Sequence, residues 1–385
     1  MTIYLDNNAT TPLAPEVREA MLPHLFERFG NPSSPHAAGM AAKQAVGEAR
    51  GQVAGLIGAR SAEILFTASA TEANHAALLG VLRALAERDP ARRHLVTTAV
   101  EHPSTLMLAR DLERQGWPVT VLPVDGAGLI DLDALRAAVT DATALVSVMW
   151  ANNETGAVMP VAVAAEIAKQ RGALFHTDAV QAAGRLPVGV DSLPADLLTL
   201  SAHKMHGPKG AGALYIRKGT PFAPLIHGHQ ERSRRGGTEN VPAIVGFGAA
   251  AVLARAAATD TVGVTALRDR LEQGVLARWP GSRVNGEAAP ARLPNTSNIR
   301  FADAQGRPVE AEELLMRLDR AGIAVSMGAA CATGGQEPSH VLTAMGLSAA
   351  EAGASLRFSL SRYSTGDEVD AVLAELPTLH ARLAA

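Results

Sequence analysis

The sequence predicts an α/β protein with a largely parallel sheet, followed by a smaller α+β unit. Two observations carry this prediction. Short apolar strands alternate with amphipathic helices over residues 60–217, and the composition changes after about residue 255. At 385 residues, the chain is also long enough for two domains, each with its own core.

The strands expected in the first unit are short and mostly apolar. They cover residues 64–67, 94–98, 119–123, 144–149, 174–177, 197–200 and 212–216. The runs at 119–123 and 144–149 are continuously apolar, which is typical of strands covered on both faces. Helices are expected at 71–82, 104–115 and 161–171. The last of these lies between Pro160 and Gly172, the residues that favour a helix start and a helix end.

The second unit is expected to contain a helix at 262–276, a strand at 298–301 and a helix at 310–320. It also carries the only cysteine, Cys331, within a stretch of small residues and glycines at 326–335. A lone cysteine is commonly a buried small hydrophobic residue. Because this stretch has no large apolar neighbour and its glycines favour a mobile loop, we expect instead a presented thiol that can react as a thiolate.

Composition and charge exclude several classes of protein. The net charge of −3 and the absence of a long basic run argue against nucleic acid as a partner. One cysteine excludes an internal disulfide and a zinc site built on several thiolates. The first residues lack the order of a signal peptide, and no apolar stretch of about 18 residues could span a bilayer. We therefore expect a cytoplasmic protein with a reduced thiol and no membrane association.

Polar residues follow several predicted strands, at the edge where parallel α/β sheets bind ligands. Residues 67–74 open a helix whose free N–H groups could bind an anion, although helix capping by Ser or Thr also explains them. Later strand ends carry Glu101–Pro103, Trp150–Gly156, His176–Gln181 and Ser201–Gly210. Each segment alone could supply caps, turns or surface charges. His203 and His206 lack the further ligands of a metal site, so no resident metal is expected.

The joint pattern at these strand ends matches the requirements of pyridoxal phosphate. The aldehyde of that cofactor needs a lysine, and Lys204 follows one predicted strand. Its ring nitrogen needs a carboxylate to stay protonated, and Asp178 follows another. The interval between the two residues has room for one helix and one strand, which would place them at adjacent strand ends.

The chain resembles the cysteine desulfurases, pyridoxal-phosphate enzymes of fold type I in the class V aminotransferase group, especially their branch for nitrogen fixation and iron–sulfur cluster assembly. The motifs that carry the resemblance span nearly the whole chain and are Tyr4–Thr11, Phe29–Ser34, Glu101–Pro103, Asn152–Gly156, His176–Gln181, Ser201–Lys204, Arg235–Asn240 and Glu337–Val341. It implies a large domain at residues 14–256, with a mostly parallel seven-stranded sheet between helices. It also implies a smaller α+β domain made of residues 1–13 and 257–385, with an active loop at about 324–336.

The resemblance implies a role for each residue near the cofactor. Lys204 would bind it covalently, Asp178 would pair with the ring nitrogen, and His102 would stack on the ring and move protons. The implied cofactor-binding residues are Ala70, Thr71, His102, Asn153, Asp178, Gln181, Ser201, His203, Lys204 and Thr238. Gln181 would bind the phenolic oxygen. Thr238 would reach the phosphate of a neighbouring subunit, which implies a homodimer.

The same resemblance implies conversion of L-cysteine to L-alanine with a persulfide left on Cys331. Arg357 would clamp the substrate carboxylate, and Asn153 would touch the cofactor or the substrate. An iron–sulfur scaffold or another acceptor protein would then take the sulfur, and Cys331 could transiently ligate a cluster together with a scaffold. The loop carries Ala329 and Ala332 where the family usually has hydroxyl residues, which affects partner affinity and loop dynamics more than chemistry.

Other functions share parts of this pattern. A selenocysteine lyase or a class V aminotransferase would use the same cofactor site, but plain transamination gives Cys331 no role. A sulfur-carrier or scaffold-interaction protein without lyase activity would not need the set of Lys204, Asp178 and His102. A dinucleotide-binding fold is excluded, because the glycines at 207, 210 and 212 do not open a helix after a strand with the required spacing.

Overall fold

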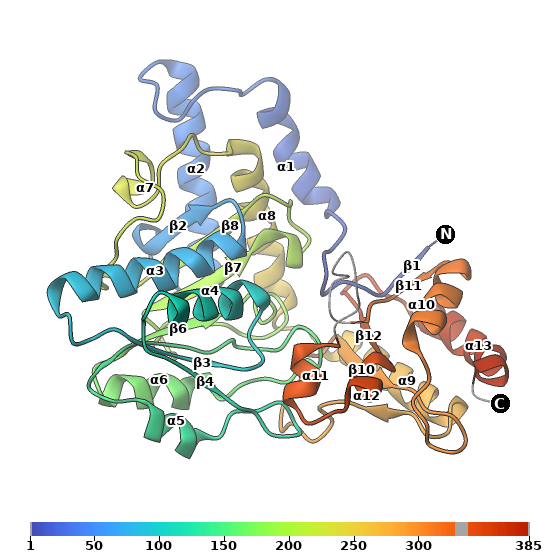
Figure 1. Ribbon diagram of the computed structural model, residues 1–385. Helices are drawn as coiled ribbons and strands as arrows, with labels where there is room; N and C mark the ends of the chain where they lie inside the picture. Colours follow the sequence, from blue (N-terminus) through green and yellow to red (C-terminus); the bar gives the residue numbers. More distant parts are fainter. Residues whose placement is uncertain (1, 328–337, 384–385) are drawn as a thin grey trace.

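The structure, a computed structural model, describes residues 2–327 and 338–383, and its central feature is a seven-stranded sheet (Figure 1). The strand order is β2-β8-β7-β6-β5-β3-β4. The strands are β2 (Ile64–Thr67), β3 (His94–Thr98), β4 (Val119–Leu122), β5 (Thr143–Ser147), β6 (Leu174–Asp178), β7 (Leu197–Ser201) and β8 (Gly212–Ile216). Strand β8 runs opposite in direction to the other six strands, which are parallel to one another. The predicted mostly parallel sheet is therefore confirmed.

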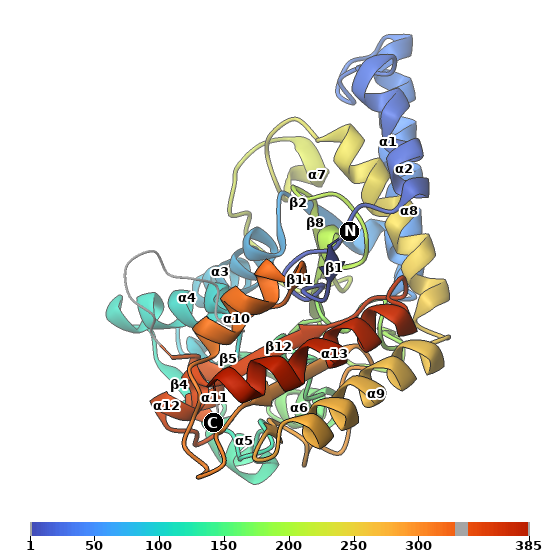
Figure 2. The same cartoon turned by 90° about the vertical axis from the view of Figure 1, so that its right-hand side faces the viewer.

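Helices cover both faces of this sheet, as expected for an α/β unit (Figures 1 and 2). Successive side chains of a strand point to opposite faces. Leu65 of β2 accordingly packs among α3 and α4, whereas its neighbour Phe66 packs among α2 and α8. The helices of this unit are α1 (Pro15–Phe26), α2 (Ala37–Leu56), α3 (Ala70–Arg88), α4 (Pro103–Arg114), α5 (Leu132–Ala138), α6 (Val161–Gln170), α7 (Gln230–Ser233) and α8 (Val241–Ala257), with short 3-10 helices η1 (Ser61–Glu63) and η2 (Ala202–Lys204).

Local sequence signals explain where several of these elements begin and end. Ser69 caps α3, because its Oγ accepts the backbone N–H of Glu72 at 3.1 Å. Helix α6 is followed by Gly172, whose φ of 66° lies in the left-handed region that favours glycine. The helix expected at 71–82 continues to Arg88, since its inner face remains apolar and buried beyond Leu82.

Two expectations about this unit are wrong. Strand β4 is not covered on both faces: it lies at the edge of the sheet, and Val121 is 44% exposed. The connection between β6 and β7 is also different from the expected helix. All residues that connect β6 to β7 are described, and none of them is in a helix. Pro187, Gly189 and Pro194 occupy this connection, and proline and glycine disfavour a continuous helix.

The second unit has a three-stranded antiparallel sheet of order β12-β10-β9 and a parallel pair, β1 and β11. Its strands are β1 (Ile3–Tyr4), β9 (Arg283–Val284), β10 (Thr296–Arg300), β11 (Ile323–Ala324) and β12 (Ser355–Ser359). Its helices are α9 (Val262–Arg278), α10 (Ala311–Arg320), α11 (His340–Ala344), α12 (Ala349–Gly353) and α13 (Gly366–Leu383). Trp279 and Phe358, both fully buried, contribute to a separate core there, which agrees with the predicted α+β unit.

The N-terminal segment joins the two units. Strand β1 pairs with β11 in the second unit, and Asp6 then forms a bridge with Ser359 of β12. The domain boundaries at 13/14 and 256/257 stay predictions. Within the described ranges, none of the helices could span a membrane alone; α8 and α9, which meet at 76°, would reach that length and composition only as a bent pair.

Candidate active site

The carboxyl ends of β6 and β7 bring the predicted aspartate and lysine to the same edge of the sheet. Asp178 is the last residue of β6, and its backbone is in register with Thr199 of β7. Lys204 ends η2, which follows β7 directly. The expected placement at adjacent strand ends is therefore correct, although no helix lies between them.

Asp178 is buried and fixed through both carboxylate oxygens. Its Oδ2 accepts the side-chain amide of Asn74 at 2.7 Å, and its Oδ1 accepts the backbone N–H of Val180 at 3.0 Å. Asn74 is itself buried and also donates to Ser104 Oγ at 3.1 Å. Asn74 was not predicted as a site residue. Only its place one turn into α3, next to the suspected anion site, could have drawn attention to it.

Lys204 is half-buried, and its amine donates to two backbone carbonyls of the N-terminal segment. The distances from Nζ are 2.5 Å to Asn8 O and 2.7 Å to Ala9 O. Burial lowers the pKa of Lys204 to about 7, and the cations Arg185 and Arg357 act in the same direction. At neutral pH a large fraction of this lysine is therefore an unprotonated amine, the form that reacts with an aldehyde.

Gln181 and Arg185 form a buried pair beside this lysine. The Gln181 amide donates to Asn8 O at 3.1 Å, and its Oε1 accepts Arg185 NH1 at 2.8 Å. Arg185 also lies 3.3 Å from the carbonyl of Lys204. These contacts fix the orientation of the Gln181 side chain, so its predicted role as a hydrogen-bond donor is sterically well defined. Arg185 was not predicted as a site residue.

His102 lies at the N-terminus of α4, where Ser104 sets its tautomer. Nδ1 accepts the backbone N–H of Ser104 at 3.1 Å and lies 2.8 Å from its Oγ. The proton of a neutral ring is thereby assigned to Nε2. Burial lowers the pKa of His102. The negative charge of Asp178 raises this pKa, whereas the positive charges of Lys204 and His340 lower it further. In this tautomer Nε2–H is the hydrogen-bond donor that the ring can offer to a substrate.

The start of α3 and the end of β7 form a cradle suited to an anion. Ala70 and Thr71 are the first residues of α3, where backbone N–H groups have no partner within the helix. The hydroxyl of Ser201 is buried and has no hydrogen-bond partner among the described residues. His203, whose Nδ1 lies 3.1 Å from Thr10 Oγ1, has a pKa lowered to about 4 by burial and by nearby cations including Lys204. It would thus contribute a neutral donor.

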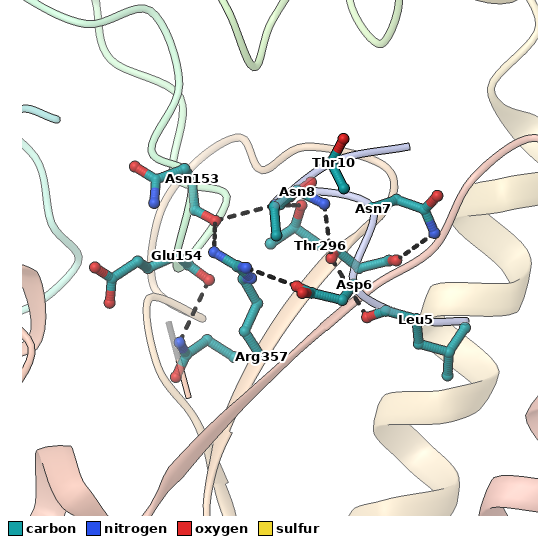
Figure 3. A network of polar contacts seen from close by, with 12 residues as sticks. Leu5, Asp6, Asn7, Asn8, Thr10, Asn153, Glu154, Thr296 and Arg357 are labelled. Atoms are coloured by element: carbon teal, nitrogen blue, oxygen red, sulfur yellow. Dashed lines mark hydrogen bonds and ion pairs between the residues drawn. The ribbon is translucent and has the colours of Figure 1, made fainter. Parts of the chain in front are cut away.

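Arg357 approaches the same site from β12 of the second unit (Figure 3). It is 3% exposed, and its guanidinium contacts Asp6 Oδ1 at 2.7 Å and the carbonyl of Asn153 at 3.0 Å. Asn8 also donates to that carbonyl, at 3.1 Å. The prediction gave Asn153 a contact with cofactor or substrate, and in this structure its backbone anchors the arginine. Asp6 was not predicted in any site role.

Cys331 lies outside the described residues, but both flanks of its segment are described. On one side, the backbones of Ser326 and Arg357 exchange hydrogen bonds of 3.2 and 2.6 Å. On the other, Ser339 Oγ donates to Glu154 Oε2 at 2.5 Å, and His340 Nε2 lies 2.9 Å from the carbonyl of Glu101. Glu101 directly precedes His102 in the sequence. The described residues on either side of the segment that carries the cysteine are therefore held next to Arg357 and His102.

Thr238 is the predicted site residue that stays apart from this cluster. It is exposed in the segment before α8, and within the described part of the chain it makes no side-chain hydrogen bond. The neighbouring Arg235 pairs with Glu72 in the first turn of α3, with Nε 2.9 Å from Oε1. The segment is thus attached next to the anion cradle, while Thr238 remains available to another molecule.

A lysine with a lowered pKa, a fixed buried carboxylate and an anion cradle at one edge of a mostly parallel sheet define a pyridoxal-phosphate site of fold type I. The "Aminotransferase class-V" family model matches residues 3–372. A cysteine desulfurase of Cereibacter sphaeroides is 54% identical over 98% of this chain and 95% of its own, and the cysteine desulfurase NifS of Azotobacter vinelandii is 46% identical over 99% and 93%. The chain belongs to the cysteine desulfurases of the class-V aminotransferase family.

Solved structures agree with this assignment. A NifS-like protein superposes with a TM-score of 0.91 at 37% identity and covers all of both chains. SspA in complex with cysteine superposes with a TM-score of 0.81 at 34% identity, over 95% of this chain and 100% of that one. The predicted fold type and its family are therefore confirmed.

Members of this family use pyridoxal phosphate, and the described residues fit it. The unpartnered Ser201 hydroxyl and the start of α3 suit its phosphate, and Asp178 suits its ring nitrogen. The pKa of Lys204, lowered to about 7, gives a large fraction of the unprotonated amine that the aldehyde requires. The predicted cofactor is thus supported by both the family and the chemistry of these side chains.

Proposed function

We propose that this protein converts L-cysteine to L-alanine and retains the sulfur as a persulfide on Cys331. One observation supports the proposal most: the described residues on either side of the Cys331 segment, Ser326 and His340, contact Arg357 and the residue before His102. Transamination alone would give this cysteine no role. The family assignment supports the same reaction, because relatives along the whole chain bear the name cysteine desulfurase.

The cofactor would be held by Asp178 at its ring nitrogen, Gln181 at its phenolic oxygen and the α3 cradle at its phosphate. When bound, it withdraws electrons from the substrate, which weakens the bonds at Cα and Cβ. Arg357 would orient the substrate through its carboxylate. Asp178 keeps its place because Asn74 and Val180 fix both of its oxygens.

The chain's own groups supply the proton and sulfur transfers. The Lys204 amine is the base for the Cα proton, since its pKa of about 7 leaves a large fraction of it unprotonated at neutral pH. Because Ser104 occupies Nδ1 of His102, the ring would present its Nε2–H to the reacting sulfur and stabilise the thiolate, whose proton leaves to solvent. The Cys331 thiolate then attacks the substrate sulfur, so that an S–S bond forms and the Cβ–S bond breaks. The three-carbon skeleton gains a proton and leaves as L-alanine.

Alanine release from L-cysteine with a reductant tests this reaction. Cys331→Ala is expected to keep the cofactor absorbance of the wild-type enzyme and to lose at least about a hundredfold in turnover, because the nucleophile is gone. Substantial retained activity in that variant would contradict the role of Cys331. Turnover that requires an added keto acid would indicate an aminotransferase, and a preference for L-selenocysteine would indicate a selenocysteine lyase.

We further propose that the enzyme is a homodimer whose sites are shared between subunits. The exposed, unpartnered Thr238 supports this, as does an apolar surface on the α1–α2 hairpin. The side chains of that surface are Leu25, Phe26, Phe29 and Met40, which are 53%, 72%, 82% and 54% exposed. Large apolar side chains gathered on a surface mark sites of association.

The fate of the sulfur and the cellular setting are also proposals. An iron–sulfur scaffold or another acceptor protein would take the persulfide sulfur, supported by the similarity to a cysteine desulfurase named NifS. Cys331 could share a cluster transiently with such a scaffold, without a resident metal of its own. A cytoplasmic location would keep its thiol reduced. Sulfur transfer from labelled cysteine to a purified scaffold protein tests the acceptor directly.

A further inference from the structure

Arg357, which the proposed function assigns to the substrate carboxylate, already contacts a carboxylate of its own chain. Asp6 Oδ1 lies 2.7 Å from NH2, and the side chains are 3% and 20% exposed for Arg357 and Asp6 (Figure 3). The second contact of the guanidinium, NH1 to the carbonyl of Asn153, carries no formal charge. Asp6 is thus the carboxylate in direct contact with this buried cation. Burial raises the pKa of the nearby Glu154, and the charge of Arg357 acts on it in the opposite direction.

The arginine retains capacity for a further acceptor. A guanidinium carries five N–H donors. Its Nε is buried and has no hydrogen-bond partner among the described residues, although a buried unpaired donor is unfavourable. This nitrogen has almost no accessible surface, so a substrate carboxylate could reach it only if the side chains around it move.

Asp6 is held in place by its own backbone. It forms a parallel bridge with Ser359, two residues beyond Arg357 on β12. The following residue, Asn7, donates its backbone N–H to Ser359 O at 3.1 Å, and the Tyr4 hydroxyl donates to Asp6 O at 3.2 Å. The carboxylate therefore stays close to Arg357 when a ligand arrives, and its negative charge acts on that ligand.

We propose that Asp6 is a positioning residue of the substrate-carboxylate site, which holds Arg357 in the empty site and moderates its attraction for the incoming carboxylate. The inference rests on the proposed function, since that assigns Arg357 to the substrate. Without a counterion, a buried arginine is strongly unfavourable. The Asp6–Arg357 pair has a net charge close to zero. A ligand carboxylate is therefore attracted by the guanidinium and repelled by the carboxylate of Asp6.

The charge of Asp6 also acts on Lys204. Burial and the cations Arg185 and Arg357 lower the pKa of this lysine, and Asp6 and Asp178 raise it to a smaller extent. The histidines around Lys204, His102 and His203, have lowered pKa values and are neutral above their own titration range. Removal of the Asp6 charge is therefore expected to shift the titration of the lysine and its linked cofactor to lower pH, an effect that lost packing alone would not produce.

The variant Asp6→Asn, studied in the holoenzyme, distinguishes the effect of the negative charge of Asp6 from the effect of its side-chain shape. Asparagine keeps an oxygen for Arg357 and removes the negative charge. Titration with L-alanine, followed by the absorbance of the bound cofactor, is expected to show about tenfold tighter binding than in the wild type. Binding of L-alaninamide, which lacks the carboxylate, should be unchanged. The matched control is Asp370→Asn, because Asp370 pairs with Arg270 on the surface, where both side chains are about half exposed.

The outcomes separate this inference from the proposed function. Unchanged L-alanine binding, or equal weakening for L-alanine and L-alaninamide, would overturn the role of Asp6. If Asp6→Asn does not fold, Asp6→Glu takes its place: it keeps the charge, so L-alanine affinity should stay within about threefold of wild type, and tenfold tighter binding would overturn the inference. If the wild type does not turn over cysteine but Asp6→Asn shows the expected shift of the cofactor titration, the proposed function is refuted and the role of Asp6 is not.

Discussion

Lys204 shows how the fold prepares a single side chain for chemistry. An ordinary lysine has a pKa near 10.4 and is almost fully protonated at neutral pH. Burial, Arg185 and Arg357 together bring the pKa of Lys204 to about 7 in the cofactor-free protein. The amine is therefore ready to react before any cofactor arrives, and its donated hydrogen bonds to Asn8 O and Ala9 O hold it at the sheet edge.

This predicts the pH dependence of cofactor uptake. The folded-state pKa is lowered, so Lys204 gains reactivity as pH rises through about 7 and is near its full rate by about pH 8. The measurement is the rate of absorbance change when pyridoxal phosphate is added to cofactor-free protein. Nα-acetyllysine, measured in parallel, corrects for ionisation of the cofactor itself. A rate that continues to rise towards pH 10 would contradict the lowered pKa.

Site residues that directly follow a predicted strand could be predicted from the sequence. Site residues whose partners are distant in the sequence could not. Lys204 and Asp178 follow apolar strands directly, so the sequence places both at the ligand edge. Asp6 lies 351 positions from Arg357, and nothing local reveals their pairing. Asn74 resembles any polar residue in an early helical turn, and only the folded structure brings it to Asp178.

At the scale of elements, the buried strands were predicted well because their apolar runs are short and clearly bounded. β3 and β8 have the predicted bounds. Strand direction and connection were harder to predict. The reversed direction of β8 leaves no mark in its own residues, and the β6–β7 connection contains no helix. The edge position of β4 likewise depends on its single neighbour, β3, rather than on its composition.

The α1–α2 hairpin was not predicted, and it projects beyond the sheet (Figures 1 and 2). Its connection is tightly built: a Cβ on Gly30 would lie 2.2 Å from Ala38 O, and one on Gly39 would lie 2.3 Å from Ser34 O. The hairpin projects, its backbone is fixed and its phenylalanines are exposed, which are features of a surface that binds another protein permanently. The proposed second subunit is such a partner.

Paired substitution of Phe26 and Phe29 by serine therefore tests the dimer. Light scattering is expected to give twice the chain mass for the wild type and to shift the variant towards monomer, since these side chains are 72% and 82% exposed in the single chain. The control is Val262→Ser, another highly exposed apolar residue, which lies outside the hairpin. A variant that stays dimeric, or a wild type that is monomeric at micromolar concentration, would refute this surface.

At the scale of the whole molecule, the site exists because two units meet. Lys204, Asp178 and His102 come from the larger unit, whereas Arg357 and both flanks of the Cys331 segment come from the smaller one. The N-terminal segment joins them, because Asp6 contacts Arg357 (Figure 3) while the carbonyls of Asn8 and Ala9 accept the amine of Lys204. Such a junction allows a base, a carboxylate clamp and a nucleophile to converge on one small substrate.

The most direct test of this account is a mass spectrum of the holoenzyme after brief incubation with L-cysteine and no reductant. We expect a gain of about 32 Da, one sulfur atom, that maps to the peptide containing Cys331 and disappears on reduction. Cys331→Ala should show no such gain while retaining its cofactor. An unmodified Cys331 in protein that nevertheless releases alanine, or added sulfur on the variant lacking this cysteine, would contradict the central claim.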